Sequence, residues 1–241
     1  MTQTHGHDAP PETDSYGSGD IDPNAPLFTL WAVLRRDAAS EGQHLFTFAG
    51  KLPEVAAELG STLRGVYDVS GLRADADIML WLVGHSAEQL QAALRQLRRT
   101  YELARLTPTW NAMGVHRDAE FSRDHWPAFS RGLPPKKWLT VYPFVRSYDW
   151  YLLPPAERGK MLADHGQKGR EFPQVQPNTV ASFALGDYEW LLALEADDVV
   201  DLVDLMRHLR NTEARRHVRE EIPFFTGRRI ELDEVREVLS S

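Results

Sequence analysis

Two stretches of the sequence repeat one residue pattern at an offset of about half the chain. The first, Leu90 to Thr100, reads Leu-x-x-Ala-Leu-Arg-x-Leu-Arg-x-Thr, and the second, Leu202 to Thr212, reads Leu-x-x-Leu-Met-Arg-x-Leu-Arg-x-Thr. In both, apolar residues recur every three to four positions, which is typical of an amphipathic helix. Two helices that are similar by chance are the alternative, but the agreement along the whole stretch favours an internal duplication. The chain is therefore expected to fold as two similar units.

The first half of the chain predicts the order βαββαβ. A β-type run, 27–35, precedes a helical segment, 43–59, and an amphipathic helix follows over 86–101. Ser86 and Gln89 form a capping box at the start of that helix. The remaining strands are expected at 65–70, 77–83 and 107–116.

The second half repeats this order. After a strand at 137–146, Pro154 and Pro155 start a helix, because proline is tolerated in the first helical turn. A further helix is expected over 197–211, with Asp197 in the capping role of Ser86, and a short surface helix from about residue 233. The strands between the two longer helices are expected at 178–185 and 188–195.

Two βαββαβ units packed sheet against sheet predict an α+β fold. Each unit is ferredoxin-like, and the pair forms a dimeric α/β-barrel within one chain. The connection between the units has aromatic residues of its own, and long connections of this kind are often functional. The expected parts are a disordered acidic tail (1–25), an N-terminal ferredoxin-like domain (26–117), a connecting segment (118–136) and a C-terminal ferredoxin-like domain (137–241).

Charge is distributed unevenly over the 241 residues, whose net charge is −8. The tail contains acidic residues but no Lys or Arg, and without a basic face nothing favours nucleic acid as a partner. No apolar run approaches the ~20 residues that span a bilayer, and the acidic N-terminus does not resemble a signal peptide. A cytoplasmic protein without a membrane span is expected. The absence of cysteine excludes disulfides, thiolate nucleophiles and Cys-ligated metal sites.

Motifs of several common enzyme classes are missing from the sequence. It contains no His-Glu-x-x-His, Gly-x-Gly-x-x-Gly, P-loop or Gly-x-Ser-x-Gly, which weakens metalloprotease, nucleotide and acyl-hydrolase interpretations. Of the nine histidines, His44, His85 and His208 lie on polar helix faces or turns, His116 ends a strand and His217 lies in a charged run. An ordinary hydrogen bond is the expected role of each. His165 differs because it lies on the short helix directly after an aromatic strand, where its imidazole could face a bound cofactor.

That aromatic strand begins at Trp138, and Tyr142, Arg146 and Trp150 share one of its faces if it stays regular. Aromatic rows in strands usually belong to a core or an interface. The functional alternative is that Tyr142 and Trp150 conduct an electron to a bound iron. An inward-facing Arg146 is costly unless it meets an anion, and a planar guanidinium suits a carboxylate.

Taken together, these residues closely resemble the actinobacterial branch of the chlorite dismutase-like family, the coproheme decarboxylases. The likeness covers nearly the whole chain from about Leu27. It implies two ferredoxin-like domains per subunit, a homopentamer and a porphyrin in the C-terminal domain. The motifs that carry it are Trp138–Tyr151, Asp164-His-Gly166, Phe183–Trp190 and Thr212–Arg229.

The resemblance also implies an activity. Iron coproporphyrin III (coproheme) would be both substrate and redox cofactor, and hydrogen peroxide would be the oxidant. Two propionates would become vinyls with loss of two carbon dioxide molecules, giving haem b through a three-propionate intermediate. The coproporphyrin ferrochelatase that makes the substrate is an implied transient partner.

Residue by residue, the resemblance makes His165 the proximal iron ligand. Tyr142 matches the tyrosine whose radical takes a hydrogen atom from the propionate β-carbon. His125 matches a distal histidine that would accept a proton, and Trp150 an aromatic beside the second reactive propionate. The candidate propionate-binding cations are Arg146, Arg215 and Arg219.

Two other functions remain open from the sequence. A chlorite dismutase or haem peroxidase would share the fold, and a non-catalytic haem-binding or delivery protein would not require Tyr142. Chlorite dismutases keep an arginine above the iron, and Ala214 aligns with it here, which argues against chlorite as the substrate.

Overall fold

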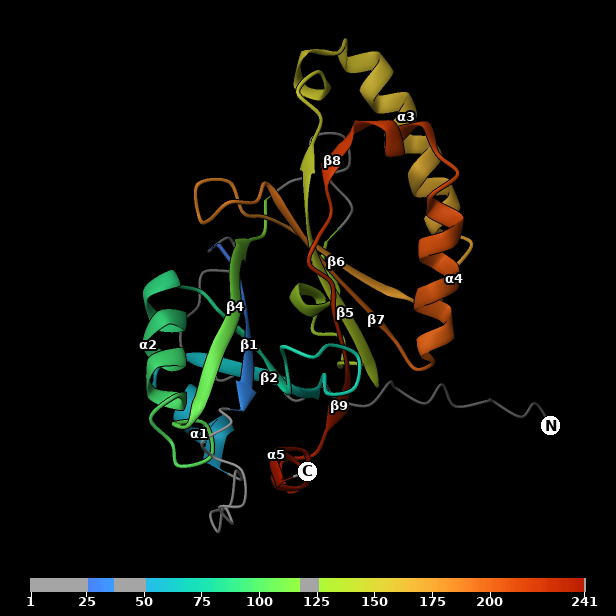
Figure 1. Cartoon of the computed structure of the whole chain (residues 1–241). Coiled ribbons are helices and arrows are strands. Elements are labelled where there is room, and N and C mark those ends of the chain that lie inside the picture. Colours follow the sequence, from blue (N-terminus) through green and yellow to red (C-terminus); the bar gives the residue numbers. More distant parts are fainter. Residues whose placement is uncertain (1–25, 37–50, 118–125, 241) are drawn as a thin grey trace, which may run out of the picture.

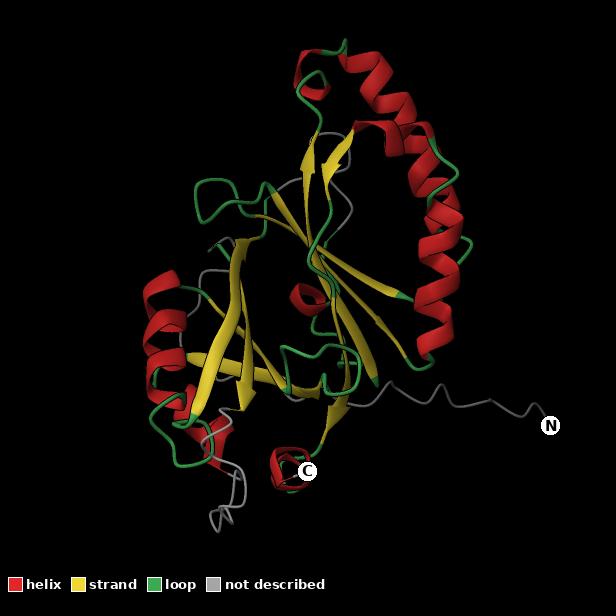
Figure 2. Cartoon of the chain, viewed as in Figure 1, coloured by secondary structure: helices red, strands yellow, loops and turns green. Residues whose placement is uncertain are grey.

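A computed structural model describes residues 26–36, 51–117 and 126–240 of the chain. In this part the two units share one β-sheet, and the α-helices lie outside it (Figures 1 and 2). Every described helix is too short or too polar to span a bilayer. Three predictions lie outside the described residues: the tail 1–25, the part 43–50 of the helical segment predicted over 43–59, and His125.

The first unit follows the predicted order βαββαβ. The capping prediction at its second helix is confirmed, because the Ser86 hydroxyl accepts a hydrogen bond from the backbone N–H of Gln89 at 3.3 Å. Its elements are β1 (Phe28–Arg36), α1 (Leu52–Ala57), β2 (Ser61–Asp68), β3 (Ile78–Gly84), α2 (Ala87–Leu97) and β4 (Leu106–Val115).

The second unit repeats this order and adds short elements. Its repeated elements are β5 (Trp138–Arg146), α3 (Pro155–Gly169), β6 (Gln176–Ala181), β7 (Trp190–Ala196), α4 (Val199–Leu209) and β9 (Phe225–Ile230). The additions are the 3-10 turns η3 (Phe129–Arg131), η4 (Trp150–Leu152) and η5 (Glu213–His217), with β8 (Val218–Glu220) and the final helix α5 (Val235–Ser240).

The prediction that Asp197 caps α4 is wrong by one residue. Asp198 is the N-cap, and its carboxylate accepts a hydrogen bond from the Val200 N–H at 2.9 Å. Asp197 instead forms an ion pair with Lys136 at 2.7 Å. Asp198 lies at the repeat offset from Ser86, so α2 and α4 begin at equivalent positions.

Strand pairing closes the sheet into a ring. In the described residues the order is β7-β6-β4-β1-β3-β2-β9-β5, an additional β5–β7 pairing closes it, and β8 extends from β5. Each half has the strand order of a ferredoxin-like unit, β4-β1-β3-β2 in the first and β9-β5-β7-β6 in the second. The predicted α+β barrel of two ferredoxin-like units is therefore confirmed.

Three apolar clusters fill the fold. The interior of the ring takes residues from both halves, including Trp31 and Trp81, whose ring centroids are 5.4 Å apart. A second cluster lies under α1, α2 and α5, and a third between the outer face of the second unit and α4. In Figure 1, α1 and α2 lie on one side of the sheet, and α3 and α4 on the other.

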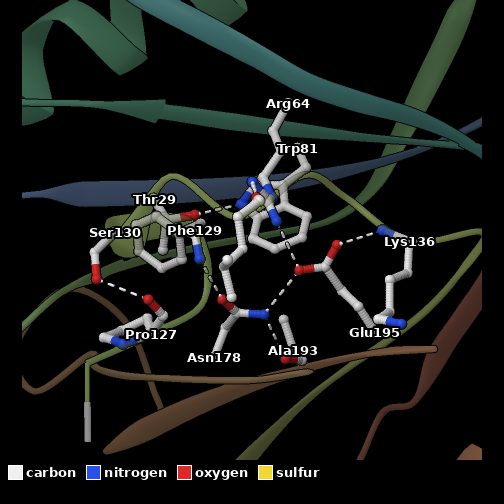
Figure 3. A network of polar contacts seen from close by, with 11 residues as sticks. Thr29, Arg64, Trp81, Pro127, Phe129, Ser130, Lys136, Asn178, Ala193 and Glu195 are labelled. Carbon is white, nitrogen blue, oxygen red and sulfur yellow. Dashed lines mark hydrogen bonds and ion pairs between the residues drawn. The ribbon is translucent and has the colours of Figure 1, made fainter. Parts of the chain in front are cut away.

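A buried polar network joins the two units inside the ring (Figure 3). The Arg64 guanidinium donates to the Glu195 carboxylate at 2.9 Å and to the Leu133 carbonyl at 2.8 Å. The same carboxylate accepts hydrogen bonds from the Asn178 amide at 3.0 Å and from the Lys136 backbone N–H at 3.1 Å. Because Arg64 belongs to β2 and Glu195 to β7, this network fixes the connecting segment against both halves.

Candidate active site

The site begins with the alternation of side chains along β5. Leu139 and Val141 belong to the core inside the ring, whereas Tyr142, Phe144 and Arg146 line a pocket on the outer face. Successive strand residues point to opposite faces, so the period of two separates a core row from a pocket row. The predicted common face is confirmed for Tyr142 and Arg146. It is wrong for Trp150, because β5 ends at Arg146 and Trp150 begins the turn η4.

The pocket lies between this face of β5 and the helices of the second unit. Its lining combines apolar side chains with arginines and one carboxylate. The residues outside β5 are His165 from α3; Leu192 from β7; Met206, Leu209 and Arg210 from α4 and its C-terminus; Thr212, Ala214, Arg215, Val218 and Glu221 from the segment that follows. Such a surface suits a flat apolar ligand with acidic arms.

His165 places an imidazole at this pocket from α3. Its Nδ1 is buried and has no hydrogen-bond partner in the described structure. Burial, and next the positive charge of Arg146, lowers the pKa of His165, so its neutral form dominates at neutral pH. A neutral imidazole is a common iron ligand. No group of three or more His, Cys, Asp or Glu side chains that could hold a bare metal ion occurs in the described residues.

Tyr142 is almost completely buried, with 4% of its surface exposed. Its ring stacks on Phe224 at a centroid distance of 4.4 Å, and its hydroxyl donates to the Met206 sulfur at 3.5 Å. Burial, and next the charge of Glu221, raises the pKa of Tyr142 above its usual range. The phenol therefore stays protonated at neutral pH, and a thioether is too weak a base to take its proton.

Arg146 is held by aromatic faces at the end of β5. Its guanidinium carbon lies 4.1 Å from the Trp150 ring centroid and 4.8 Å from that of Phe144. The Glu189 carboxylate accepts a hydrogen bond from the Arg146 backbone N–H at 2.8 Å and from the Tyr151 hydroxyl at 2.9 Å. This arrangement fixes the direction in which Arg146 leaves the strand, which favours bidentate recognition of a carboxylate.

A second cationic group lies on the α4 side of the pocket. The Glu221 carboxylate pairs with Arg210 at 2.8 Å and with Arg215 at 2.6 Å. Both guanidiniums remain more than a third exposed, whereas the Glu221 side chain is 15% exposed. Charge-assisted hydrogen bonds of this length are strong, so the pair of arginines is already neutralised in part by a protein carboxylate.

The structure brings four of the predicted site residues to one pocket: Tyr142, Arg146, His165 and Arg215. Trp150 is 2% exposed and lies behind Arg146, so it does not belong to the lining. Arg219 is directed toward Tyr148, whose hydroxyl accepts its hydrogen bond at 2.6 Å. His125 lies outside the described residues.

Sequence reasoning missed four residues of the lining that carry polar or polarisable groups: Met206, Arg210, Thr212 and Glu221. Arg210 and Met206 lie one turn apart at the end of α4, so their shared face could have been found from the helical period. Glu221 follows β8 in a segment without periodicity, and no local signal marks it.

Comparison with known proteins gives consistent matches. The chlorite dismutase family model matches residues 35–230. The chain is 47% identical over 208 residues to the coproheme decarboxylase of Mycolicibacterium smegmatis, covering 86% of this chain and 90% of that protein. Its fold is similar to a mutant chlorite dismutase from Candidatus Nitrospira defluvii, with a TM-score of 0.77 at 19% identity over 89% of this chain and 96% of the other. The structure of chlorite dismutase from the same organism in complex with imidazole gives a TM-score of 0.72 at 18% identity, over 89% of this chain and 95% of the other.

Proposed function

The chain belongs to the chlorite dismutase family, and from this membership we propose that it is a hydrogen peroxide-dependent coproheme decarboxylase. The observation that carries the proposal is the 47% identity to a coproheme decarboxylase over most of both chains. The pocket supports it, because an imidazole, arginines and apolar walls are the groups that an iron porphyrin with carboxylate arms requires.

The reaction converts each of two propionates of iron coproporphyrin III to a vinyl group. For each arm, R–CH2–CH2–COOH and H2O2 give R–CH=CH2, CO2 and two H2O. The arm is oxidised by two electrons and peroxide is reduced to water. The first conversion gives a three-propionate intermediate, and the second gives haem b.

The residues of the pocket divide into those that hold the substrate and those that act on it. His165 would ligate the iron, Arg146 and Arg215 would pair with propionates, and Leu192 and Leu209 would pack against the ring. The bound iron would supply the chemistry by which peroxide is turned into a strong oxidant. We propose that the ligand is bound by the C-terminal domain, 137–241, and the lining residues of the pocket, which all belong to this part of the chain, support this.

Tyr142 relays the oxidation to the substrate arm. Its phenoxyl form would take a hydrogen atom from the propionate β-carbon, which returns the phenol to its starting state. The carbon radical would then give its second electron to the remaining oxidising equivalent supplied by peroxide and release carbon dioxide, which leaves the vinyl group. Because burial keeps the phenol protonated, its oxidation requires a proton acceptor close by. His125 supplies this acceptor in our proposal, and Trp150 supports the second reactive arm through its stack with Arg146.

The family also suggests the assembly and the setting of the reaction. We propose a homopentamer in the cytoplasm, with a transient contact to the ferrochelatase that makes the substrate. These parts of the proposal rest on the family resemblance and not on the geometry of the pocket.

Two variants test the function. Tyr142→Phe should still bind iron coproporphyrin III but form no haem b, because the ring packing on Phe224 is kept and the hydroxyl is lost. His165→Ala should weaken binding itself. Mass spectrometry of the porphyrin after titration with peroxide follows the loss of carbon dioxide and two hydrogen atoms from each arm.

Tyr148→Phe is the matched control, because Tyr148 is 78% exposed and does not line the pocket. It should decarboxylate as the wild type does. Haem b formation by Tyr142→Phe at the wild-type rate would refute the radical relay. Release of oxygen from chlorite by the wild type, without decarboxylation, would replace the proposed activity, and binding without either reaction would indicate a carrier protein.

A further inference from the structure

We propose that Glu221 is an internal counter-ion that holds Arg210 and Arg215 before substrate binds and gives them up to a carboxylate of the substrate. The inference rests on the proposed function and adds a residue that sets how strongly substrate is bound relative to product. Glu221 would act as a stand-in for one propionate.

The contacts support this role directly. Both arginines line the same pocket as His165, and both donate through Nη1 to the Glu221 carboxylate, at 2.8 and 2.6 Å. A carboxylate between two guanidiniums makes the same hydrogen bonds that a substrate propionate would make. The two arginines are thus already paired with an anion, and this chain supplies it.

The exposure of the three groups shows how an exchange can take place. The side chains of Arg210 and Arg215 are 38% and 40% exposed, whereas that of Glu221 is 15% exposed. Each guanidinium has five N–H donors, so a second carboxylate can begin to bind before the first has left. One carboxylate then replaces another, and neither arginine is left without an anion at any stage.

Glu221 belongs to a loop and not to a strand. Glu221 lies between β8 and β9, in the segment 221–224, which is outside both strands. The next residue, Ile222, is 73% exposed. A side chain carried by such a segment can leave the arginines without breaking a strand pairing.

The position beside Tyr142 identifies which propionate competes with Glu221. Tyr142 lines the same pocket, and after burial its pKa responds to the charges of Glu221, Arg210 and Arg215. A carboxylate in this place would belong to the arm on which Tyr142 acts. When that arm becomes a vinyl group its charge is lost, and Glu221 can pair with the arginines again.

This exchange predicts different effects on substrate and product. Iron coproporphyrin III must displace Glu221, so its binding is weakened by the free energy of the two ion pairs. Haem b has a vinyl group in the same place and leaves the ion pairs intact. Glu221 therefore lowers the affinity for iron coproporphyrin III but not the affinity for haem b. The advantage of the substrate over the product in competing for the pocket becomes smaller.

The test compares dissociation constants of iron coproporphyrin III and haem b, measured by absorbance titration without peroxide. In Glu221→Gln, iron coproporphyrin III should bind about tenfold more tightly, or ~1.4 kcal/mol, with haem b changed by less than about twofold (~0.4 kcal/mol). Glu221→Asp keeps the charge, but its side chain is one methylene shorter and cannot reach both arginines. The affinity for iron coproporphyrin III should therefore rise in this variant too. Glu220→Gln removes a charge from the exposed neighbouring residue and should behave as wild type.

A second measurement uses the wild type alone. Carbodiimide labelling of carboxylates, mapped by peptide mass spectrometry, should increase at Glu221 when iron coproporphyrin III binds and stay unchanged with haem b. This result does not depend on whether the variants fold.

The proposed exchange would be refuted if Glu221→Gln raised the affinity for both porphyrins equally. It would also be refuted if Glu221→Asp bound both porphyrins with wild-type dissociation constants. Labelling of Glu221 that does not rise with iron coproporphyrin III would refute it as well. Peroxide is added afterwards to the same samples. A failure to decarboxylate would count against the proposed function, while the binding ratios would still report on Glu221.

Discussion

Replacing Glu195 with alanine should destabilise the protein strongly, because the change leaves a buried charge without its partner. Glu195 is fully buried and the Arg64 side chain is 2% exposed. Removing one member of such a pair costs about 3–5 kcal/mol. The same substitution removes the acceptor of the Lys136 N–H and one of the two acceptors of the Asn178 amide, which keeps its bond to the Ala193 carbonyl. Each buried N–H left unpaired costs about 1–3 kcal/mol. These effects overlap, so we expect a loss of about 4–5 kcal/mol in the free energy of unfolding.

Urea denaturation and thermal melting measure this loss. For a chain of this length, about 4 kcal/mol corresponds to a fall in Tm of roughly 8–16 °C. Asp197→Asn is the matched control, since Asp197 also pairs across the connecting segment, with Lys136, but is 73% exposed. An exposed pair contributes about 0–1 kcal/mol.

A double variant separates charge from packing. Arg64→Met with Glu195→Leu removes both charges, and it should recover part of the stability lost in Glu195→Ala, since a buried pair replaced by apolar residues is often close to neutral. The Lys136 N–H and one N–H of the Asn178 amide stay unpaired, and the Leu133 carbonyl loses its Arg64 donor, so recovery should be incomplete. If the free energy of unfolding of Glu195→Ala lies within about 1 kcal/mol of the wild-type value, the Arg64–Glu195 pair does not hold the two units together as we infer.

Two further predictions concern the barrel seam and the pH range of the site. Gly114→Ala should destabilise the protein, because its Cβ would overlap the Val180 side chain where β4 meets β6. Gly169→Ala, in open space at the end of α3, should be neutral or stabilising by up to about 1 kcal/mol. Urea denaturation measures both, and equal effects would contradict the close packing of Gly114 against Val180. The pKa of His165 is lowered below 6.5, so just below that pH the folded protein binds fewer protons than the unfolded chain. The free energy of unfolding should therefore fall as the pH drops through 6.5. The neutral imidazole persists in the folded protein, so iron coproporphyrin III should still bind at pH values somewhat below 6.5. Stability and absorbance titrations across this range test it, and a His165→Leu variant whose stability falls just as steeply would contradict it.

Several parts of the fold follow from local sequence. The repeated helical pattern gave two equivalent helices, and the alternation along β5 placed Tyr142 and Arg146 on one face. Both are short-range periodicities, which depend on the geometry of a single helix or strand. The capping of α2 by Ser86 is equally local. The cap of α4 also follows from the sequence, because Asp198 lies at the repeat offset from Ser86, whereas Asp197, which was predicted instead, pairs with Lys136.

Other parts depend on contacts between distant segments. The closing of the ring requires β9 to lie between β2 and β5, and no pattern within β9 specifies these neighbours. The helix α5 packs Val235, Val238 and Leu239 into the core of the first unit, although the sequence suggested a surface helix. Glu221 could not be recognised either, because its role comes from two arginines that α4 and η5 bring to it.

The two units have the same fold, yet the side chains of only one of them line the pocket, and the helices explain the difference. In the first unit α1 buries Leu52 and Ala56, and α5 adds three apolar residues to the same cluster. The corresponding helix of the second unit, α3, has no buried residue. At the repeat offset Leu97, fully buried under α2, becomes Leu209 at the wall of the pocket. One unit thus fills this space with a core and the other leaves it as a pocket, because α3 buries no apolar residue and presents His165 to the pocket.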